Sequence, residues 1–255
     1  MMKIPASILN ALAALLLAAG PVAAQAVSNP EPIGAAQTGK FPFSMAGQLV
    51  FKNGASYYQA SGTVVWQRSV LTAAHNLWSP ESGWSTEMEF NRARSGPSIA
   101  SRQFATRLFI FGSYRSAAAQ YGTDSVRTFA NDLGGLRFSR MPASGMYAGW
   151  VADVTGLTGG PPAICLGYGA VIHTGNDLLS VISAAPFVQA TGAFMENFSL
   201  TFEEGMSGGP VFFPVAPDDL RIVGVVVAGS DTPPSGAIRA IDAAGAAFIT
   251  TYLHY

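Results

Sequence analysis

The sequence alternates short runs of β-branched and aromatic residues with turn residues along most of its length. Residues 46–51 and 57–60 flank Asn53-Gly54, a pair that is typical of a tight antiparallel hairpin. Residues 61–66 and 69–72 form a second pair of strand-like runs around a short connection. Many short strands with frequent turns favour a β barrel or β sandwich over alternating strands and helices.

Further strand-like runs continue to residue 228, and turn residues separate nearly all of them. They lie at 88–90, 107–111, 133–138, 163–166, 179–185, 193–202, 211–213 and 222–228. Residues 76–100 contain two prolines and two glycines and are predicted to be mainly loop around the first of these strands. Apolar residues near the end recur mostly at spacings of three and four, which predicts one amphipathic helix: Ile241, Ala244, Phe248, Ile249, Tyr252 and Leu253.

The charge and composition exclude two classes of protein. The chain carries 14 Lys and Arg against 15 Asp and Glu, and 49% of its 255 residues are hydrophobic. A net charge of −1 without a basic run offers no electrostatic surface for nucleic acid, so we expect no nucleic-acid partner. A chain this apolar is not a disordered one, and its length suits one compact unit or two small ones.

The amino-terminal segment has the composition of a secretory signal peptide. Lys3 supplies a positive start, residues 8–19 are apolar apart from Asn10, and small residues near position 24 offer a cleavage site. The apolar stretch is shorter than the ~20 residues that span a bilayer, which argues against a membrane anchor. We expect removal of residues 1–24, export to the periplasm or the medium, and a lead-in or short pro-segment at residues 25–41.

Cys165 is the single cysteine, so the chain can form no internal disulfide. It lies within an apolar run, 163–167, without a neighbouring His or Asn, which favours a buried structural thiol over a nucleophile. No histidine pair has the spacing of metal ligands, so we expect neither a metal nor another cofactor.

Three short segments carry residues suited to nucleophilic catalysis. Residues 71–75 (LTAAH) run from an apolar strand through two alanines to His75, and small residues there allow a tight turn of the backbone. Residues 131–136 (NDLGGL) place Asp132 at the mouth of an apolar strand. Residues 205–210 (GMSGGP) surround a serine with glycines, which permit a tight loop whose backbone N–H groups can point to one oxyanion.

His75 is the histidine best placed for chemistry, because His173 precedes a polar turn and His254 is the penultimate residue. Asp124 competes with Asp132 as the acid, but it lies in a turn that no apolar strand follows. His75 and Asp132 are therefore the candidate base and acid.

In this order, the three segments resemble the motifs around the base, the acid and the nucleophile of chymotrypsin-like (trypsin-like) serine proteases. Residues 61–63 (SGT), residues 166–169 (LGYG) and the terminal helix extend the resemblance to most of the chain. The bacterial glutamyl endopeptidase branch is similar in having few or no disulfides and a segment like residues 235–238 (SGAI).

The resemblance implies an all-β fold of two antiparallel six-stranded β barrels with a C-terminal helix. Residues 42–145 would form the first barrel, with His75 and Asp132, and residues 146–255 the second, with Ser207. Ser207 would attack the scissile carbonyl of a polypeptide, His75 would accept its proton, and Asp132 would orient the imidazole. The expected protein is a monomeric, exported, cofactor-free serine endopeptidase with its active site between the barrels.

The resemblance also implies an oxyanion hole and two substrate-binding segments. The backbone N–H groups of Gly205 and Ser207 would bind the oxyanion. Substrate-binding residues would be Thr201 and Phe202 at the specificity pocket, and Val227, Ala228 and Gly229 along the substrate backbone.

Three positions depart from the family pattern. Thr201 stands where trypsin-type enzymes carry an acid, and Val226 where glutamyl-specific enzymes carry a histidine, so neither a basic nor a glutamyl preference is supported. Met206 replaces the aspartate that pairs with the new amino terminus in activated trypsin-type enzymes. That activation switch is therefore absent or works differently.

The pattern of glycines around Ser207 also fits the nucleophile elbow of α/β-hydrolases, with Asp231 and His254 as downstream partners. An elbow serine must be followed by a helix. Pro210 and Pro214 instead bracket a strand-like run, so this alternative fails.

Two non-enzymatic hypotheses remain beside the protease. A catalytically silent relative would use the cleft only to bind a peptide or a partner protein, and Met206 leaves room for it because the serine loop lacks its usual anchor. A secreted β-sandwich binding module would give Ser207 no role.

Overall fold

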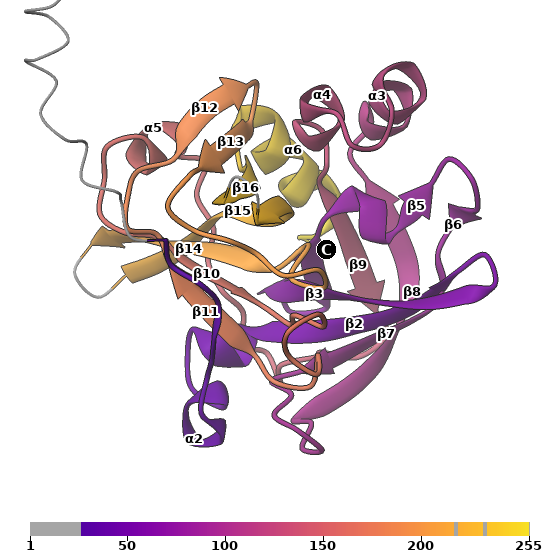
Figure 1. The fold of residues 1–255 in the computed structure, drawn as a ribbon. Coiled ribbons are helices and arrows are strands. Elements are labelled where there is room, and N and C mark those ends of the chain that lie inside the picture. The colour runs from indigo at the N-terminus through magenta and orange to yellow at the C-terminus, as the bar shows by residue number, and fades with distance from the viewer. Residues whose placement is uncertain (1–26, 217–218, 232–233, 255) are drawn as a thin grey trace, which may run out of the picture.

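The computed structural model describes residues 27–216, 219–231 and 234–254. Two antiparallel β-sheets and a helix near the C-terminus form most of the fold (Figure 1), which confirms the predicted all-β class. The predicted signal segment, residues 1–24, lies outside the described residues. No helix in the described ranges has the length and apolar character to cross a membrane.

The first sheet is a closed six-stranded barrel, as predicted. Its hydrogen-bonded order is β2 (Ala46–Asn53), β3 (Ser56–Trp66), β4 (Ser69–Thr72), β9 (Gly134–Phe138), β8 (Ser101–Ile110) and β7 (Thr86–Arg92). Asn53 pairs with Ser56, and Gly54 between them has a φ of 60°, a left-handed conformation that favours glycine. The predicted hairpin at Asn53-Gly54 is therefore confirmed.

The second sheet contains eight strands, two more than the prediction. Their order is β1 (Glu31–Pro32), β11 (Leu179–Ile182), β10 (Ile164–Gly167), β14 (Pro210–Ala216), β15 (Asp219–Asp231), β16 (Pro234–Ala240), β13 (Phe194–Asn197) and β12 (Val188–Thr191). The two end strands account for the difference, because both residues of β1 and most of β12 are exposed and show no apolar alternation. Within the described residues β1 and β12 are not paired with each other.

Short helices and one small hairpin fill the connections. They are α2 (Ala35–Thr38), η1 (Phe43–Met45), η2 (Ala74–Asn76), α3 (Tyr114–Tyr121), α4 (Val126–Phe129), α5 (Val154–Leu157) and the hairpin of β5 (Trp78–Ser79) with β6 (Gly83–Trp84). The prediction of a single helix is therefore too low. Helices α3 and α4 lie side by side at one end of the first barrel (Figure 1), and α4 leads directly into Asp132.

The predicted terminal helix is present as α6 (Ala243–Tyr252). Asp242 caps it, since its side chain accepts a hydrogen bond from the Gly245 N–H at 2.8 Å. Although α6 follows the second sheet, its apolar face packs on the first barrel. Leu253 lies so close to Gly135 of β9 that a side chain at Gly135 would collide with it.

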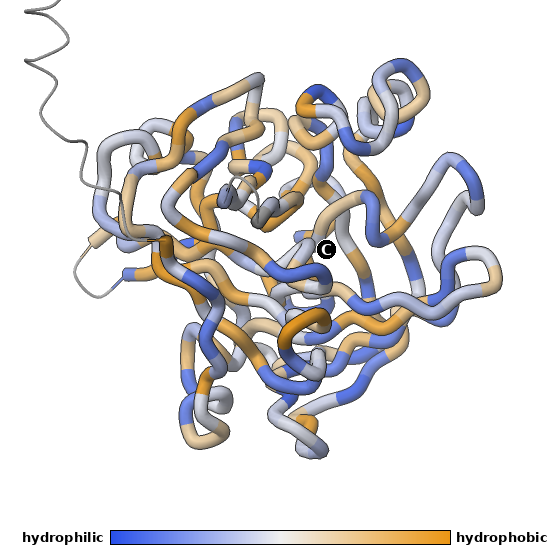
Figure 2. The backbone as a smooth tube through the Cα atoms, viewed as in Figure 1, coloured by the Kyte–Doolittle hydropathy of each residue, from blue (hydrophilic) through white to orange (hydrophobic). Residues whose placement is uncertain are grey.

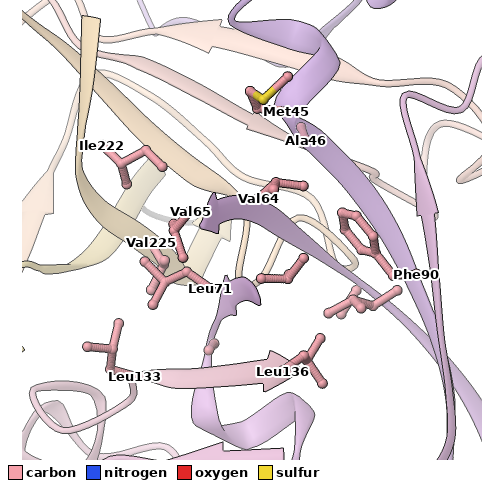
Figure 3. Packing of buried hydrophobic residues seen from close by; sticks show 14 of the residues in the cluster. Met45, Ala46, Val64, Val65, Leu71, Phe90, Leu133, Leu136, Ile222 and Val225 are labelled. Atoms are coloured by element: carbon pink, nitrogen blue, oxygen red, sulfur yellow. The ribbon is translucent and has the colours of Figure 1, made fainter. Parts of the chain in front are cut away.

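The two halves share a hydrophobic core. Figure 3 shows Val65, Leu71 and Leu133 of the first barrel gathered with Ile222 and Val225, which β15 of the second sheet contributes. Figure 2 shows apolar colour mainly along the inner strands and polar colour on the outer loops. The sheets are thus joined by continuous apolar packing, and no disulfide supports them, because the one cysteine is unpaired.

A smaller apolar cluster fills the second half. It contains Cys165, Met195, Val211 and Met206, all fully buried. Burial raises the pKa of the Cys165 thiol, which agrees with a structural rather than a nucleophilic role. Met206 packs against the backbone of Gly167, where a side chain would collide with it.

Replacement of Leu253 by alanine should lower the free energy of unfolding by about 2–5 kcal/mol, because it leaves a cavity between α6 and the first barrel. Urea denaturation followed by fluorescence measures this change. Thr250→Ala on the exposed face of the same helix is the control and should change stability by less than about 0.5 kcal/mol. Equal effects of the two substitutions would contradict the packing described.

Replacement of Met206 by aspartate should destabilise the protein by more than about 3 kcal/mol, because it buries a carboxylate in an apolar cluster without a cationic partner. Met206→Leu keeps the volume and the apolar character and should cost less than about 1.5 kcal/mol. Thermal and urea unfolding of both variants check this. An aspartate variant as stable as wild type would mean that a cation reaches this position.

Candidate active site

His75 lies where strand β4 leaves the first barrel. The strand ends at Thr72, and His75 is in the short 3-10 turn η2 that follows. The backbone of Gly134 in β9 packs closely on Ala73 and Ala74, so that an added side chain would meet them at 3.1 Å. Ala73 and Ala74 are small enough for the turn to pack tightly on the neighbouring strand β9.

Asp132 uses both carboxylate oxygens to hold His75. Its Oδ2 lies 2.6 Å from the His75 Nδ1, and its Oδ1 accepts a hydrogen bond from the His75 backbone N–H at 2.9 Å. The Asp132 side chain is fully buried, whereas 31% of the His75 side chain is exposed. The carboxylate thus fixes both the position and the ring orientation of the histidine, leaving its other ring nitrogen for another partner.

The pKa of His75 is raised above its ordinary value. Burial of the imidazole acts in the opposite direction and is the largest single effect, but the charge and the hydrogen bond of Asp132 together outweigh it. Asp124 adds a weaker attraction from a greater distance. Asp124 is exposed in the connection between α3 and α4, and Asp132, not Asp124, touches His75.

Ser207 lines the same cavity as His75. This cavity has a volume of about 440 Å³ and is also bordered by Gln59, Asn76 and Gly205. His75 comes from the first barrel and Ser207 from the loop before β14 of the second sheet. The structure therefore brings the candidate base and nucleophile to one opening between the two halves, and the candidate acid lies buried in contact with the base.

The first barrel holds the backbone of Ser207. Its carbonyl accepts hydrogen bonds from the Ser61 N–H at 2.9 Å and from the Asn76 side chain at 3.1 Å. Gly208 has a φ of 83°, and a side chain there would collide with Thr72 and Ser61. Sequence reasoning noted residues 61–63 only through the family resemblance and missed Asn76, whose contact with Ser207 links residues far apart in the chain.

Hydrogen bonds orient the Glu204–Gly205 peptide and the Gly205–Met206 peptide that follows it. The Ala170 N–H donates to the Glu204 carbonyl at 2.9 Å, and the Ser61 hydroxyl donates to the Gly205 carbonyl at 2.8 Å. Since C=O and N–H of a trans peptide point in opposite directions, the Gly205 N–H points away from Ala170. Among the described residues, neither the Gly205 N–H nor the Ser207 N–H donates to a protein acceptor.

Thr201, Phe202 and Gly229 line a second cavity of about 590 Å³, next to the first. Glu204 borders both cavities. Phe202 is buried, and its backbone lies against Gly229, which leaves no room for a side chain at that glycine. Phe202 borders this space beside Thr201.

Val227 and Ala228 are not among the residues that line the second cavity. They lie on β15 beyond Val225, the last residue of that strand that pairs with β14. On its other side this part of β15 pairs with β16. In the described part of the chain, residues 227–229 therefore have an unpaired edge on the side of β14, where an extended peptide can add as a strand.

The lead-in segment forms one wall of the second cavity, which sequence reasoning did not anticipate. Ser28 exchanges backbone hydrogen bonds with Ser199 and Thr201, and the Thr201 hydroxyl donates to the Asn29 side chain at 3.0 Å. Asn29 and Glu31 border the cavity. No local signal marked this contact, because it joins segments far apart in the sequence.

An acid–base pair also borders the second cavity. The Nδ1 of His173 lies 2.5 Å from Oε1 of Glu203, and Oε2 of Glu203 faces the backbone N–H groups of Ile172 and His173 at 3.3 Å. Sequence reasoning placed His173 before a polar turn and gave it no role. The chain does bend after His173, where Gly175 has a φ of 73°. The histidine ring, however, contacts Glu203 in the segment that precedes Ser207.

Val226, which stands where a glutamyl-specific enzyme would carry its pocket histidine, is buried in the apolar cluster of the second half. In residues 27–216, 219–231 and 234–254, no group of three or more His, Cys, Asp or Glu residues gathers as metal ligands.

No protein-family model matches the chain, and no curated protein matches its sequence. Solved structures do match. A Glu endopeptidase in complex with MPD has a TM-score of 0.68 and 17% identity, over 87% of this chain and 95% of its own. Protease Anisep from Arthrobacter nicotinovorans has a TM-score of 0.64 and 17% identity, over 83% and 96%.

A thermostable serine protease, AL20, from an extremophilic microorganism is similar to the same extent. It has a TM-score of 0.65 and 15% identity, over 82% of this chain and 98% of its own. These structures match nearly the whole of each protease and a large share of this chain, so the likeness extends to both halves. The chain has the fold of the chymotrypsin-like serine proteases.

Proposed function

We propose that the protein is an exported serine endopeptidase that hydrolyses peptide bonds through an acyl-enzyme. The observation that carries this proposal is the double contact of Asp132 with His75 at the cavity that Ser207 lines. Its fold, which is that of solved serine proteases, supports the same conclusion.

In the proposed reaction, Ser207 Oγ attacks the carbonyl carbon of the scissile bond while His75 takes the serine proton. The C–N bond of the tetrahedral intermediate then breaks, and His75 gives the proton to the departing amine. Water repeats the two steps on the ester and releases Ser207. Asp132 keeps the Nδ1 proton of His75 in place and stabilises the imidazolium that forms twice in the cycle.

The oxyanion hole would consist of the N–H groups of Gly205 and Ser207. Both are without a protein acceptor among the described residues, and the Gly205 N–H is turned away from Ala170 by the bond of the Glu204 carbonyl. Each such donor is worth about 10²–10³ in rate in comparable sites.

A polypeptide substrate would add its backbone to the unpaired edge at Val227, Ala228 and Gly229, as a further antiparallel strand. One of its side chains would then enter the cavity lined by Thr201 and Phe202. Position 201 carries a threonine, whose hydroxyl already donates to Asn29. It therefore offers no carboxylate to a basic side chain. The Thr201 position therefore does not favour Arg or Lys in the substrate.

The remaining parts of the proposal concern the whole chain. Residues 1–24 would direct export and be removed, and the mature protein would act as a monomer outside the cytoplasm. Residues 42–145 and 146–255 would be the two structural halves that bring the triad together.

Labelling with a fluorophosphonate probe tests the nucleophile. Wild type should be labelled at Ser207, and both Ser207→Ala and His75→Ala should abolish labelling, because the hydroxyl reacts only when the histidine removes its proton. Turnover of a peptide library should fall by about 10⁶ in the serine variant. Ser82→Ala, a serine that borders the same cavity, is the matched control and should label normally.

A folded wild type that does not react with the probe would contradict the endopeptidase proposal. It would favour the catalytically silent alternative, in which the cleft only binds a peptide.

The pH dependence of kcat/KM tests the contact between Asp132 and His75. The base must be neutral, so activity should fall as the pH drops through the raised pKa of His75, above the ordinary value of about 6.5. Asp132→Asn removes the charge that raises this pKa and should move the acidic limb to lower pH, with a loss of about 10⁴ in kcat.

Asp124→Asn is the control for long-range charge. It should move the acidic limb slightly in the same direction and leave kcat near that of wild type, because Asp124 does not touch His75. An acidic limb that stays in place in Asp132→Asn would contradict the assigned base.

A further inference from the structure

The segment before Ser207 lacks the charged anchor that an aspartate at position 206 would provide. Met206 is buried among apolar side chains and cannot form an ion pair. The Glu204–Gly205 peptide must nevertheless keep one orientation if the Gly205 N–H is to face an oxyanion. Contacts other than an ion pair at position 206 therefore hold this peptide, among them the hydrogen bond from Ala170 to the Glu204 carbonyl.

The His173–Glu203 pair lies directly beside it. Glu203 precedes Glu204 in the chain, and its carboxylate binds the His173 ring and faces two backbone N–H groups of the loop at residues 170–173. The carbonyl of Glu204 accepts from Ala170 in the same loop. Glu203 and Glu204 are thus both tied to the loop at residues 170–173. The Glu204 carbonyl is part of the Glu204–Gly205 peptide, so the loop contacts this peptide directly.

Burial makes this pair a strong constraint. Only 5% of the Glu203 side chain and 25% of the His173 side chain are exposed. A buried carboxylate without partners destabilises the folded state, so the Glu203 side chain keeps the loop at residues 170–173 close to the segment before Ser207. Gly169 fits the same picture, because a side chain there would collide with the Glu203 carboxylate. The second glycine of the LGYG segment is therefore required by Glu203.

We propose that the His173–Glu203 pair is a positioning device that keeps the Gly205 N–H directed at the oxyanion, in place of the charged anchor that Met206 cannot supply. The inference rests on the proposed endopeptidase function. Neither residue touches the reacting atoms, and both act through the Glu204–Gly205 peptide. A pair that only packed the loop would leave this peptide, and the rate of the chemical step, unchanged.

Kinetics of four variants test the device: Glu203→Ala, Glu203→Gln, His173→Ala and the double alanine variant. In both single alanine variants, kcat and the rate of fluorophosphonate labelling should fall about 10–100-fold, which is part of the ~10²–10³ that one oxyanion donor supplies. The double variant should lose little more than either single one, because the two residues act as a unit. Glu203→Gln keeps an acceptor for the N–H groups and should recover part of the loss.

Binding of a peptide separates positioning from substrate contact. In a Ser207→Ala background, Glu203→Ala should change the Kd of an uncleaved peptide less than about threefold, because the ground state makes little use of the oxyanion hole. Asp219→Asn, which breaks a remote ion pair with Arg221 at 2.6 Å, is the matched control and should change neither kcat nor labelling.

The mobility of the Gly205 amide tests the same claim without activity. In protein labelled with ¹⁵N-glycine, its order parameter should be near the rigid value of about 0.85 in wild type and fall below about 0.6 in Glu203→Ala. Glu203→Gln serves as the second variant if the alanine variant folds poorly.

Wild-type kcat in folded Glu203→Ala, a loss that appears only in peptide binding, or an unchanged order parameter would each overturn the proposal. A wild type that does not react with the probe would instead overturn the endopeptidase function. In that case the Gly205 order parameter still decides whether the pair holds the peptide.

Discussion

The carbonyl of Ser207 is the point on which the arrangement of the two halves depends. Two donors of the first barrel, the Ser61 N–H and the Asn76 side chain, reach across to this single oxygen. Thr72 supports both, since its hydroxyl donates to the Ser61 carbonyl and accepts from Asn76. The proposed nucleophile, in the loop before β14 of the second sheet, is thereby fixed by the barrel that carries the proposed base.

The hydrogen bonds of this junction are buried or partly buried, and they can form because no side chain at position 208 lies between the two halves. Gly208 approaches Thr72 and Ser61 so closely that no other residue fits, and its φ of 83° favours glycine as well. Around the junction, Leu71 of the first barrel and Val225 and Ile222 of the second sheet belong to one buried apolar cluster, and burial of apolar surface stabilises the contact between the halves. Hydrogen bonds set the register of the two halves, and the core keeps them together.

Local patterns in the sequence predicted much of this structure. The Asn53-Gly54 hairpin, the terminal helix and most strands follow from turn residues and from apolar periodicity, which act over a few neighbouring residues. His75 and Asp132 were paired in advance by their strand contexts and by the family resemblance, and they do touch. The assignment of Ser207 as the nucleophile stays a prediction that its position at the shared cavity supports.

What local patterns could not supply are contacts between distant segments. The partners of Glu203 and of Thr201, and the hydrogen bond from Asn76 to Ser207, join residues with no periodic relation. Helices α3 and α4 escaped notice because they are short and only a few of their residues are buried. The two extra strands of the second sheet are mostly exposed, so they carry no apolar alternation that a reader of the sequence could recognise.

Strand β1 pairs with β11 at one border of the second sheet. Glu31 and Pro32 cover backbone groups of Leu179 and Ser180 at the border of the second sheet. An uncovered strand border is a template for joining other chains, and a proline is one of the usual means of blocking it. Residues 31 and 32 thus cover this strand border, and a chain trimmed past Pro32 would expose the backbone groups of β11 that they pair with.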